Sequence, residues 1–377
     1  MTRYTTRLAL AMIVRDEATQ LPAFFAHHEG LADEIVVVDT GSRDNSRDLA
    51  VAAGAVVVDH PWQDDFAAAR NAGLDAVTAD WIIFLDADER VSQADFAEIR
   101  QALPPQPDRV FLQESWNYCL GLSHLEWQPL SGRYPVEEAG QTGMFVARRV
   151  GVFPRLAKLR FSGRVHETVL TAAEARGLAV LPLAVPVHHY GYAKTAAVNE
   201  ARQQRYRRLV ELKYADDPSD PAAQLELATI LLESGEPAAA MVHLEEVAAG
   251  PPGLRPVVRG LVLQGRLRRE MGELVVSGKL LAVAVDQDPD FLFGWLELIR
   301  TAAQAEDWGA AENALAVAEG RFGGQNPQLL RESLRIKVKT GQLAAALQTA
   351  DELVTLSPQW AEIRALRDRL QRMTGRH

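Results

Sequence analysis

The 377-residue sequence is first informative for what it lacks. Its single cysteine, Cys119, excludes an internal disulfide and a cysteine-rich zinc site. The apolar run Leu8–Val14 is too short to span a bilayer, which needs roughly 18 apolar residues, and it lacks a small-residue cleavage site. A net charge of −10 argues against a nucleic-acid binder, which usually carries a basic patch. These absences predict a cytoplasmic protein without a transmembrane segment or a nucleic-acid partner.

Several common catalytic motifs are also missing. The chain has no Gly-x-Gly-x-x-Gly after a strand, no Walker-type loop and no Gly-x-Ser-x-Gly elbow. His166-Glu167 could begin a zinc-protease motif, but position 170 is Leu, so the second histidine is absent. Without a glycine-rich cradle, any bound diphosphate must be held by a metal ion and a few basic side chains.

The most informative feature present is the run Trp81–Leu85, which is apolar and ends in the carboxylates Asp86, Asp88 and Glu89. An apolar run of this length predicts a strand buried on both faces. Unpaired carboxylates at its end would repel one another, and a bound cation removes that conflict. Carboxylate oxygens suit Mg²⁺ or Mn²⁺, with substrate phosphates completing the shell. The alternative is a solvated strand end that caps the next helix.

The first ninety residues repeat one pattern, in which an apolar run ends in polar residues and a helical period follows. The four apolar runs are Leu8–Val14, Glu34–Val38, Ala55–Val58 and Trp81–Leu85. Strands that alternate with helices predict a parallel, right-handed α/β sheet, with ligands beyond the carboxyl ends of the strands. Shorter β-like runs between residues 109 and 192 suggest an acceptor-facing half built on the same sheet.

After residue 192 the pattern becomes helical. Residues 199–213 predict a basic linker helix, and Gly235, Gly272 and Gly341 each separate two helical patterns, with Asp307 at the comparable place of a fourth unit. Small residues follow five positions after each of these glycines; they are Ala240, Ser277 and Ala346. This period resembles about four degenerate tetratricopeptide repeats. A generic helical bundle is the alternative.

Four motifs together resemble family 2 glycosyltransferases of the GT-A fold, over roughly residues 8–192. In order they are Ala11-Met12-Ile13-Val14-Arg15-Asp16-Glu17, Val36-Val37-Val38-Asp39-Thr40-Gly41-Ser42, Phe66-Ala67-Ala68-Ala69-Arg70-Asn71 and Phe84-Leu85-Asp86-Ala87-Asp88-Glu89. Within that family the chain looks most like bacterial members with C-terminal tetratricopeptide repeats. That group includes peptide and protein glycosyltransferases and enzymes of lipopolysaccharide core synthesis.

The resemblance implies an α/β GT-A domain with a Rossmann-like, mostly parallel sheet at residues 1–198, a linker helix at 199–215 and all-α tetratricopeptide-like repeats at 216–377. It also implies a set of residues that bind the nucleotide sugar: Val14, Arg15, Glu17, Asp39, Arg70, Asp86 and Ala87. Asp39 would contact the nucleobase or ribose, although alone it could form a helix-capping turn. Arg70 would lie near the base or diphosphate, although alone it could be a surface arginine.

The resemblance further implies a metal site and a catalytic base. Asp88 would bind Mn²⁺ or Mg²⁺ directly, and either His188 or His189 would complete the shell, with His189 preferred for its place before Tyr-Gly. Either histidine could instead be a satisfied core residue. Glu167 falls where the family places its base, with Glu137 and Glu138 as the next candidates.

The implied activity is a metal-dependent, inverting glycosyltransferase of hexosyltransferase type. It would use a nucleotide-diphosphate sugar, with UDP favoured, and a peptide or protein acceptor in preference to lipopolysaccharide or another glycan. The repeats would recruit the acceptor or form a homodimer. Two other functions stay open, namely a repeat scaffold with an inactive transferase domain and a sugar-nucleotide pyrophosphorylase. The second usually needs a basic glycine-rich loop where this chain has Arg15-Asp16-Glu17.

Overall fold

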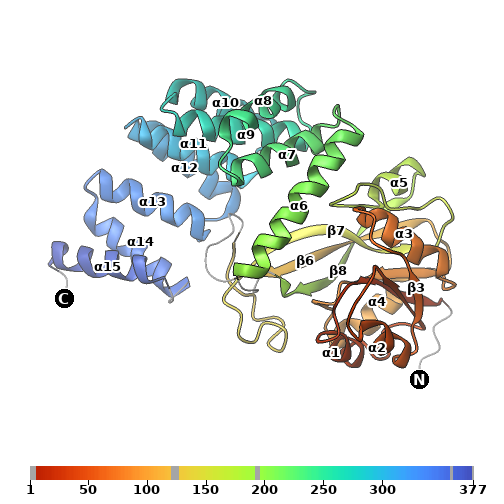
Figure 1. The fold of residues 1–377 in the computed structure, drawn as a ribbon. Helices are drawn as coiled ribbons and strands as arrows, with labels where there is room; N and C mark the ends of the chain where they lie inside the picture. The colour runs from red at the N-terminus through yellow and green to blue at the C-terminus, as the bar shows by residue number, and fades with distance from the viewer. Residues whose placement is uncertain (1–5, 120–126, 192–195, 357–359, 376–377) are drawn as a thin grey trace. The chain divides into compact units, whose positions relative to one another are not determined.

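The computed structural model describes residues 6–119, 127–191, 196–356 and 360–375, and they form two compact units (Figure 1). The first unit comprises residues up to 120 and 130–213, and the second comprises 121–129 and everything from Tyr214 onward. The boundary falls inside helix α6 (Ala196–Asp216), the helix that the sequence predicts as a linker. The domain limits inferred from the sequence stay a prediction. No helix in the described ranges is long and apolar enough to cross a membrane.

A mixed eight-stranded sheet, in the order β3-β2-β1-β4-β7-β6-β8-β5, organises the described part of the first unit. Its strands are β1 (Leu8–Val14), β2 (Glu34–Asp39), β3 (Val56–Asp59), β4 (Trp81–Phe84), β5 (Glu89–Arg90), β6 (Arg109–Tyr118), β7 (Met144–Pro154) and β8 (Ala179–His189). The first four are parallel, as predicted, whereas β7 runs antiparallel to both β4 and β6. The sheet is therefore parallel at one side and mixed at the other.

Helices cover both faces of this sheet, and the alternation of side chains along each strand explains why. On β1, Leu10 and Met12 belong to one apolar core, while Ala9 and Ala11 belong to the other. The first core also takes residues from α1 (Leu21–His27), α2 (Ser46–Ala52) and α4 (Phe96–Ala102), which follows the short 3₁₀ turn Gln93–Asp95. The second takes residues from α3 (Phe66–Ala76) and α5 (Leu170–Ala175) (Figure 1). β1 and β4 are buried on both faces, so their sequences are continuous apolar runs.

The second unit consists of helix pairs followed by one further helix in its described residues. The pairs are α7 (Pro221–Glu233) with α8 (Pro237–Ala248), α9 (Arg255–Glu270) with α10 (Leu274–Gln287), α11 (Leu292–Gln304) with α12 (Trp308–Phe322) and α13 (Pro327–Lys339) with α14 (Leu343–Leu356), and the last helix is α15 (Ala361–Thr374). The tetratricopeptide-like fold predicted from the sequence is confirmed.

Three hinge glycines adopt the left-handed backbone that turns one helix into the next, with φ of 76° at Gly235, 82° at Gly272 and 76° at Gly341. The small residues five positions later, Ala240, Ser277 and Ala346, are fully buried. In the third pair the prediction was wrong by one position. The left-handed residue is Glu306, with φ of 56°, and Asp307 caps α12 by accepting a hydrogen bond from Ala310 N.

Candidate active site

The carboxyl ends of β1 and β2 carry the residues predicted to bind the nucleotide. Val14 O accepts hydrogen bonds from both Thr40 N and Thr40 Oγ1, at 3.0 Å each. Asp39 Oδ1 accepts from Gly41 N at 2.9 Å and Ser42 N at 2.8 Å, so one carboxylate oxygen builds the turn after β2. Asp39 can form this turn and also bind a ligand, because its second carboxylate oxygen accepts no hydrogen bond from the described residues.

The loop after β1 is tied to the loop after β2. Asp16, whose φ of 56° is left-handed, accepts a hydrogen bond from Arg43 N at 2.7 Å, and its own N–H donates to Ser42 Oγ at 3.0 Å. Glu17 N donates to Ser46 Oγ at 2.7 Å. These bonds hold the exposed Arg15 and the half-buried Glu17 at the same edge of the sheet as Asp39.

The acidic turn after β4 is less repulsive than its sequence suggests, because arginines from distant elements neutralise it. Glu89 is almost fully buried, and its Oε2 accepts from Asp86 N at 2.9 Å and from Arg149 Nη2 at 2.5 Å. Asp86 Oδ1 lies 3.3 Å from Arg70 Nη2. The expectation that the carboxylates at this strand end are unpaired was therefore wrong for Asp86 and Glu89, each of which has an arginine partner.

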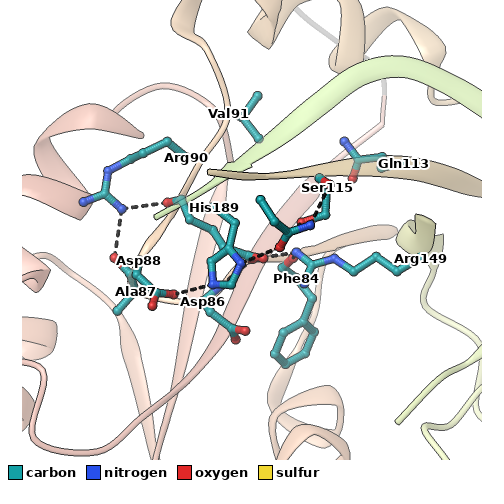
Figure 2. A network of polar contacts seen from close by, with 12 residues as sticks. Phe84, Asp86, Ala87, Asp88, Arg90, Val91, Gln113, Ser115, Arg149 and His189 are labelled. Carbon is teal, nitrogen blue, oxygen red and sulfur yellow. Dashed lines mark hydrogen bonds and ion pairs between the residues drawn. The ribbon is translucent and has the colours of Figure 1, made fainter. Parts of the chain in front are cut away.

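Asp88 instead faces a histidine. Its Oδ1 lies 3.5 Å from Nε2 of His189, and the two side chains point toward each other in Figure 2. His189 Nδ1 lies 2.7 Å from Asn117 Oδ1, and the amide nitrogen of Asn117 donates to Ser115 O at 2.8 Å, which leaves Oδ1 as the acceptor for the ring N–H. Nε2, the nitrogen directed at Asp88, is then the one able to bind a metal ion.

The pKa of His189 reflects this acidic neighbourhood. Burial acts to lower it, but the hydrogen bond to Asp88 and the charges of Glu89, Asp88 and Asp86 outweigh burial and raise the pKa above its ordinary value.

The Asp88–His189 pair fits a divalent ion together with substrate phosphates. A Cβ on Gly191 would come within 2.5 Å of His189 Nε2 and 2.7 Å of Asp88 Oδ2, so only glycine at this position leaves both donor atoms in place. The described residues contain no group of three or more His, Cys, Asp or Glu side chains placed to hold a metal. Mg²⁺ in nucleotide enzymes is, however, usually held by only one or two carboxylates together with substrate phosphates and water.

Glu167 is brought to this site by Arg70. Its Oε1 accepts from Arg70 Nε at 2.5 Å, and the same guanidinium reaches Asp86. Arg70 is buried, with its guanidinium carbon 4.5 Å from the ring centroid of Phe84. Burial acts to lower the Arg70 pKa, but the charges of Asp86 and Glu167 raise it on balance. Glu167 Oε2 accepts no hydrogen bond from the described part of the chain, so one oxygen is anchored and the other is available.

The other candidate residues occupy different environments. His188 is fully buried, bonded through Nδ1 to Tyr118 Oη at 2.7 Å, and burial lowers its pKa to about 4. Glu138 closes its own loop by accepting from Ser131 Oγ at 2.7 Å and Gly132 N at 2.8 Å. His188 and Glu138 are thus used structurally.

Glu137 differs from its neighbour. Its carboxylate has no hydrogen-bond partner among the described residues, and it lines a cavity of ≈ 310 Å³ together with Asp88, Arg90 and Tyr190. Ala87, predicted to contact the donor, is buried, and its carbonyl accepts from Arg90 Nη1 at 2.8 Å.

Two residues that orient side chains of this site were not predicted from the sequence. Arg149 lies on β7 and Asn117 on β6, within strands that extend well past the short runs predicted there. Neither belongs to a motif. Their partners Glu89 and His189 are far away in the chain, so only the sheet order brings them together.

Comparison with known proteins gives a consistent result. The family model for glycosyl transferase family 2 matches residues 12–143. A TPR repeat-containing protein of Synechococcus elongatus is 30% identical over 78% of this chain and 70% of its own length. The SPbeta prophage-derived glycosyltransferase SunS of Bacillus subtilis is 23% identical over 58% of this chain and 47% of that protein.

Among solved structures, a thermophilic TPR protein of Thermus thermophilus covers 46% of this chain and 93% of its own, with 19% identity and a TM-score of 0.38. The transferase family model covers the strands and turns that carry Asp39, Asp86 and Asp88, and the Synechococcus relative extends the match over most of the chain. The chain therefore belongs to the family 2 glycosyltransferases and is a member that carries C-terminal tetratricopeptide repeats.

Proposed function

We propose that this glycosyltransferase moves a sugar from a UDP-sugar to a peptide or protein acceptor, with inversion at the anomeric carbon and with Mn²⁺ or Mg²⁺ bound at Asp88 and His189. The observation that carries the proposal is the charge arrangement around β4. Asp88 and His189 face each other beside Gly191, while Arg70 links Asp86 to Glu167.

Donor binding is assigned to the edge formed by β1, β2 and β4. Asp39 keeps one oxygen for the nucleobase or ribose, and the turn that it caps leaves Val14, Arg15 and Glu17 beside it. Arg70 is buried and already paired with two carboxylates, so its contribution is to orient Asp86 and Glu167 rather than to grip the diphosphate directly.

When bound, the divalent ion supplies positive charge opposite the leaving nucleoside diphosphate. The protein's own part is to orient its ligands. Asn117 holds the His189 ring so that Nε2 faces Asp88, and Glu89 fixes the acidic turn through Asp86 N. Preorganised groups of this kind avoid reorganisation during the reaction.

Glu167 is assigned the role of general base. The Arg70 guanidinium fixes one carboxylate oxygen, and the other can accept the proton of the attacking acceptor group. Glu137 is the second candidate, because its carboxylate lines the cavity that Asp88 also lines.

The peptide or protein acceptor is supported by the repeats. Tetratricopeptide arrays stack helix pairs into extended concave surfaces, which suit an extended polypeptide. Such an array has no evident role in activating a nucleotide sugar. A glycan acceptor and a homodimer formed through the repeats remain alternative uses of the second unit.

A thermal-shift panel tests the proposal. UDP-glucose, UDP-N-acetylglucosamine, UDP-galactose and GDP-mannose are added to the full chain with and without Mn²⁺. A ligand at about 100 times its dissociation constant stabilises by roughly 2.7 kcal/mol, a shift of a few degrees. We expect a UDP-sugar to shift melting only with Mn²⁺, and this shift to disappear in Asp39→Ala. Metal-independent shifts, or none with any UDP-sugar, would overturn the assignment.

A further inference from the structure

Helix α6 contacts the loop that carries Glu167, through side chains to which the proposed reaction gives no role. Tyr206 Oη lies 3.0 Å from His166 Nε2, and the two ring centroids are 5.4 Å apart. Lys213 Nζ donates to Val165 O at 3.5 Å. Since the first unit extends to Lys213, all these contacts lie within the transferase unit.

The contacted loop has a backbone that needs support. Ser162 and Thr168 exchange two backbone hydrogen bonds of 3.0 and 3.1 Å and so close a short loop between them. Within it, His166 has a φ of 52°. A non-glycine residue in this left-handed region is strained, so surrounding contacts must hold it there. His166 is also the immediate neighbour of Glu167, so a change in its backbone angles redirects that carboxylate.

A second set of contacts fixes the start of the same loop. Arg208 of α6 pairs with Asp64 at 2.8 Å, and Asp64 O accepts from Arg164 Nη1 at 3.4 Å. Arg164 O in turn accepts a hydrogen bond of 2.9 Å from the N–H of Phe66, which is the first residue of α3. Leu209 and Val210, which follow Arg208 in α6, are fully buried. The helix is therefore docked on the transferase unit and not merely strung between two domains.

We infer that α6 is part of the transferase site and that Tyr206 is a positioning residue, which holds Glu167 in place through His166. Tyr206 touches neither the reacting atoms nor the assigned ligands of the donor. The inference rests on the proposed role of Glu167 as base. It adds that removing the Tyr206 hydroxyl loosens the loop and lowers turnover without weakening donor binding.

The first test follows amide hydrogen exchange in the full chain. Tyr206→Phe removes the hydroxyl and keeps the ring. The matched control is Tyr214→Phe, on the same helix, where the ring contacts His243 in the second unit. We expect several-fold faster exchange in the peptide spanning residues 162–168 for Tyr206→Phe only. Equal exchange in the two variants would overturn the inference, whatever the enzyme does with a donor.

The second test measures UDP release from UDP-glucose and UDP-N-acetylglucosamine with Mn²⁺. For Tyr206→Phe we expect kcat to fall roughly 10- to 100-fold, the range for a misplaced catalytic group, with KM for the donor unchanged. In a Glu167→Gln background the same change should have no further effect, because the positioned group is already gone.

The outcomes separate the two claims. An additive loss in the double variant, or an unchanged kcat in Tyr206→Phe, overturns the positioning role even if Glu167 is the base. A drop of less than tenfold in Glu167→Gln overturns the positioning role as well, because Tyr206 then has no base to position. A wild-type chain that releases no UDP from either donor refutes the proposed function instead. Amide exchange then still decides whether α6 orders the loop.

Discussion

The two units bury glutamates against arginines in different ways. In the repeats, the fully buried Glu297 has both oxygens occupied, Oε1 by Arg300 Nη1 at 2.8 Å and Oε2 by Arg269 Nη2 at 2.9 Å. In the transferase unit, Glu167 has Oε1 on Arg70 and no described partner for Oε2. The arrangement around Glu297 connects neighbouring helices, and both of its carboxylate oxygens are used in doing so. The second holds a carboxylate in one orientation and leaves a proton-accepting oxygen.

Burial of a charged side chain therefore does not by itself indicate a catalytic or binding role. A fully paired buried carboxylate contributes to specificity or stability. Removing one partner of the pair costs several kcal/mol, because the other charge is then buried without a partner. A half-paired carboxylate retains an oxygen that can bind a ligand or accept a proton. Changes at single carboxylates, at buried histidines and at hinge residues test how the two units differ.

The largest effect is expected at the open site. Asp88→Asn should reduce transfer below detection, because it removes the proposed metal ligand, and loss of a catalytic metal ion costs several kcal/mol of transition-state stabilisation. The chain should stay folded without metal, because Arg70 and Arg149 already neutralise Asp86 and Glu89 in this turn. UDP release and thermal melting check this, with the exposed Asp48→Asn on α2 as control. Full activity at saturating Mn²⁺ would remove Asp88 from the metal site.

Glu167→Gln comes next. It should lower turnover roughly 10²- to 10⁴-fold, the usual range for loss of a general base, while the Mn²⁺-dependent thermal shift with UDP-sugar stays. Glu174→Gln, an exposed glutamate on α5, is the matched control. A drop of less than tenfold would transfer the base role to Glu137, and Glu137→Gln should then show the larger loss.

The fully paired glutamate of the repeats should affect stability alone. Glu297→Ala leaves Arg269 and Arg300 without their shared partner, and the second unit should lose about 3 kcal/mol. Urea unfolding measures the loss, and the exposed Glu362→Ala on α15 serves as control. UDP release should be unchanged under conditions where the chain is folded. A loss of turnover without a loss of stability would contradict the distinction drawn between the units.

Acidification should distinguish the units by their buried histidines. Burial lowers the pKa of His28 to about 3 and that of His188 to about 4, both in the transferase unit. In the unfolded chain both histidines bind protons below about pH 6.5, whereas in the folded chain they stay neutral. The free energy of unfolding of the transferase unit therefore falls as pH falls, by at most about 2 kcal/mol between pH 6.5 and 5.5. His189, with its raised pKa, acts in the opposite direction.

Urea unfolding at the two pH values, followed by tryptophan fluorescence and by hydrogen exchange of each unit, checks this. His188→Gln should reduce the pH dependence of the transferase unit. If the repeats lose stability more steeply than the transferase unit, the buried histidines are not the source.

The smallest effect concerns the hinges between repeat helices. Gly235→Ala places a Cβ at a φ of 76° and should cost about 1–2 kcal/mol. Glu306→Gly relieves the left-handed strain at φ 56° but adds freedom to the unfolded chain, so stability should change by less than about 1 kcal/mol. Thermal melting of the two variants compares them directly. A cost at Glu306→Gly as large as that at Gly235→Ala would show that its side chain has a packing role.

Much of the fold followed from local patterns. Trp81–Leu85 predicted a strand because a run of apolar residues before a turn has few other uses, and the structure has β4 at Trp81–Phe84. The hinge glycines were readable because a left-handed backbone strongly favours glycine. Glu306 broke that rule, and the third hinge was consequently placed one residue late, at its cap Asp307.

The candidate site was predictable only in part. Asp39, Asp86, Asp88 and Glu167 sit in short motifs, and their motifs suggested them as site residues, but their roles stay predictions. The arginine that neutralises Glu89 and the amide that orients His189 carried no sequence signal, because Arg149 and Asn117 act across strands that are paired only in the folded sheet. Likewise, nothing in the basic helix around Tyr206 indicated contact with His166.

The sequence by itself determined the strand–helix alternation, the repeat period, the family and the order of the acidic motifs, because each depends on neighbours within a few residues. Only the tertiary structure decided which carboxylates are neutralised, which histidine faces Asp88 and where α6 docks. Those outcomes depend on contacts between residues far apart in the chain. Because a buried charge without a partner is costly, each carboxylate pairs with a basic side chain that the fold brings near it.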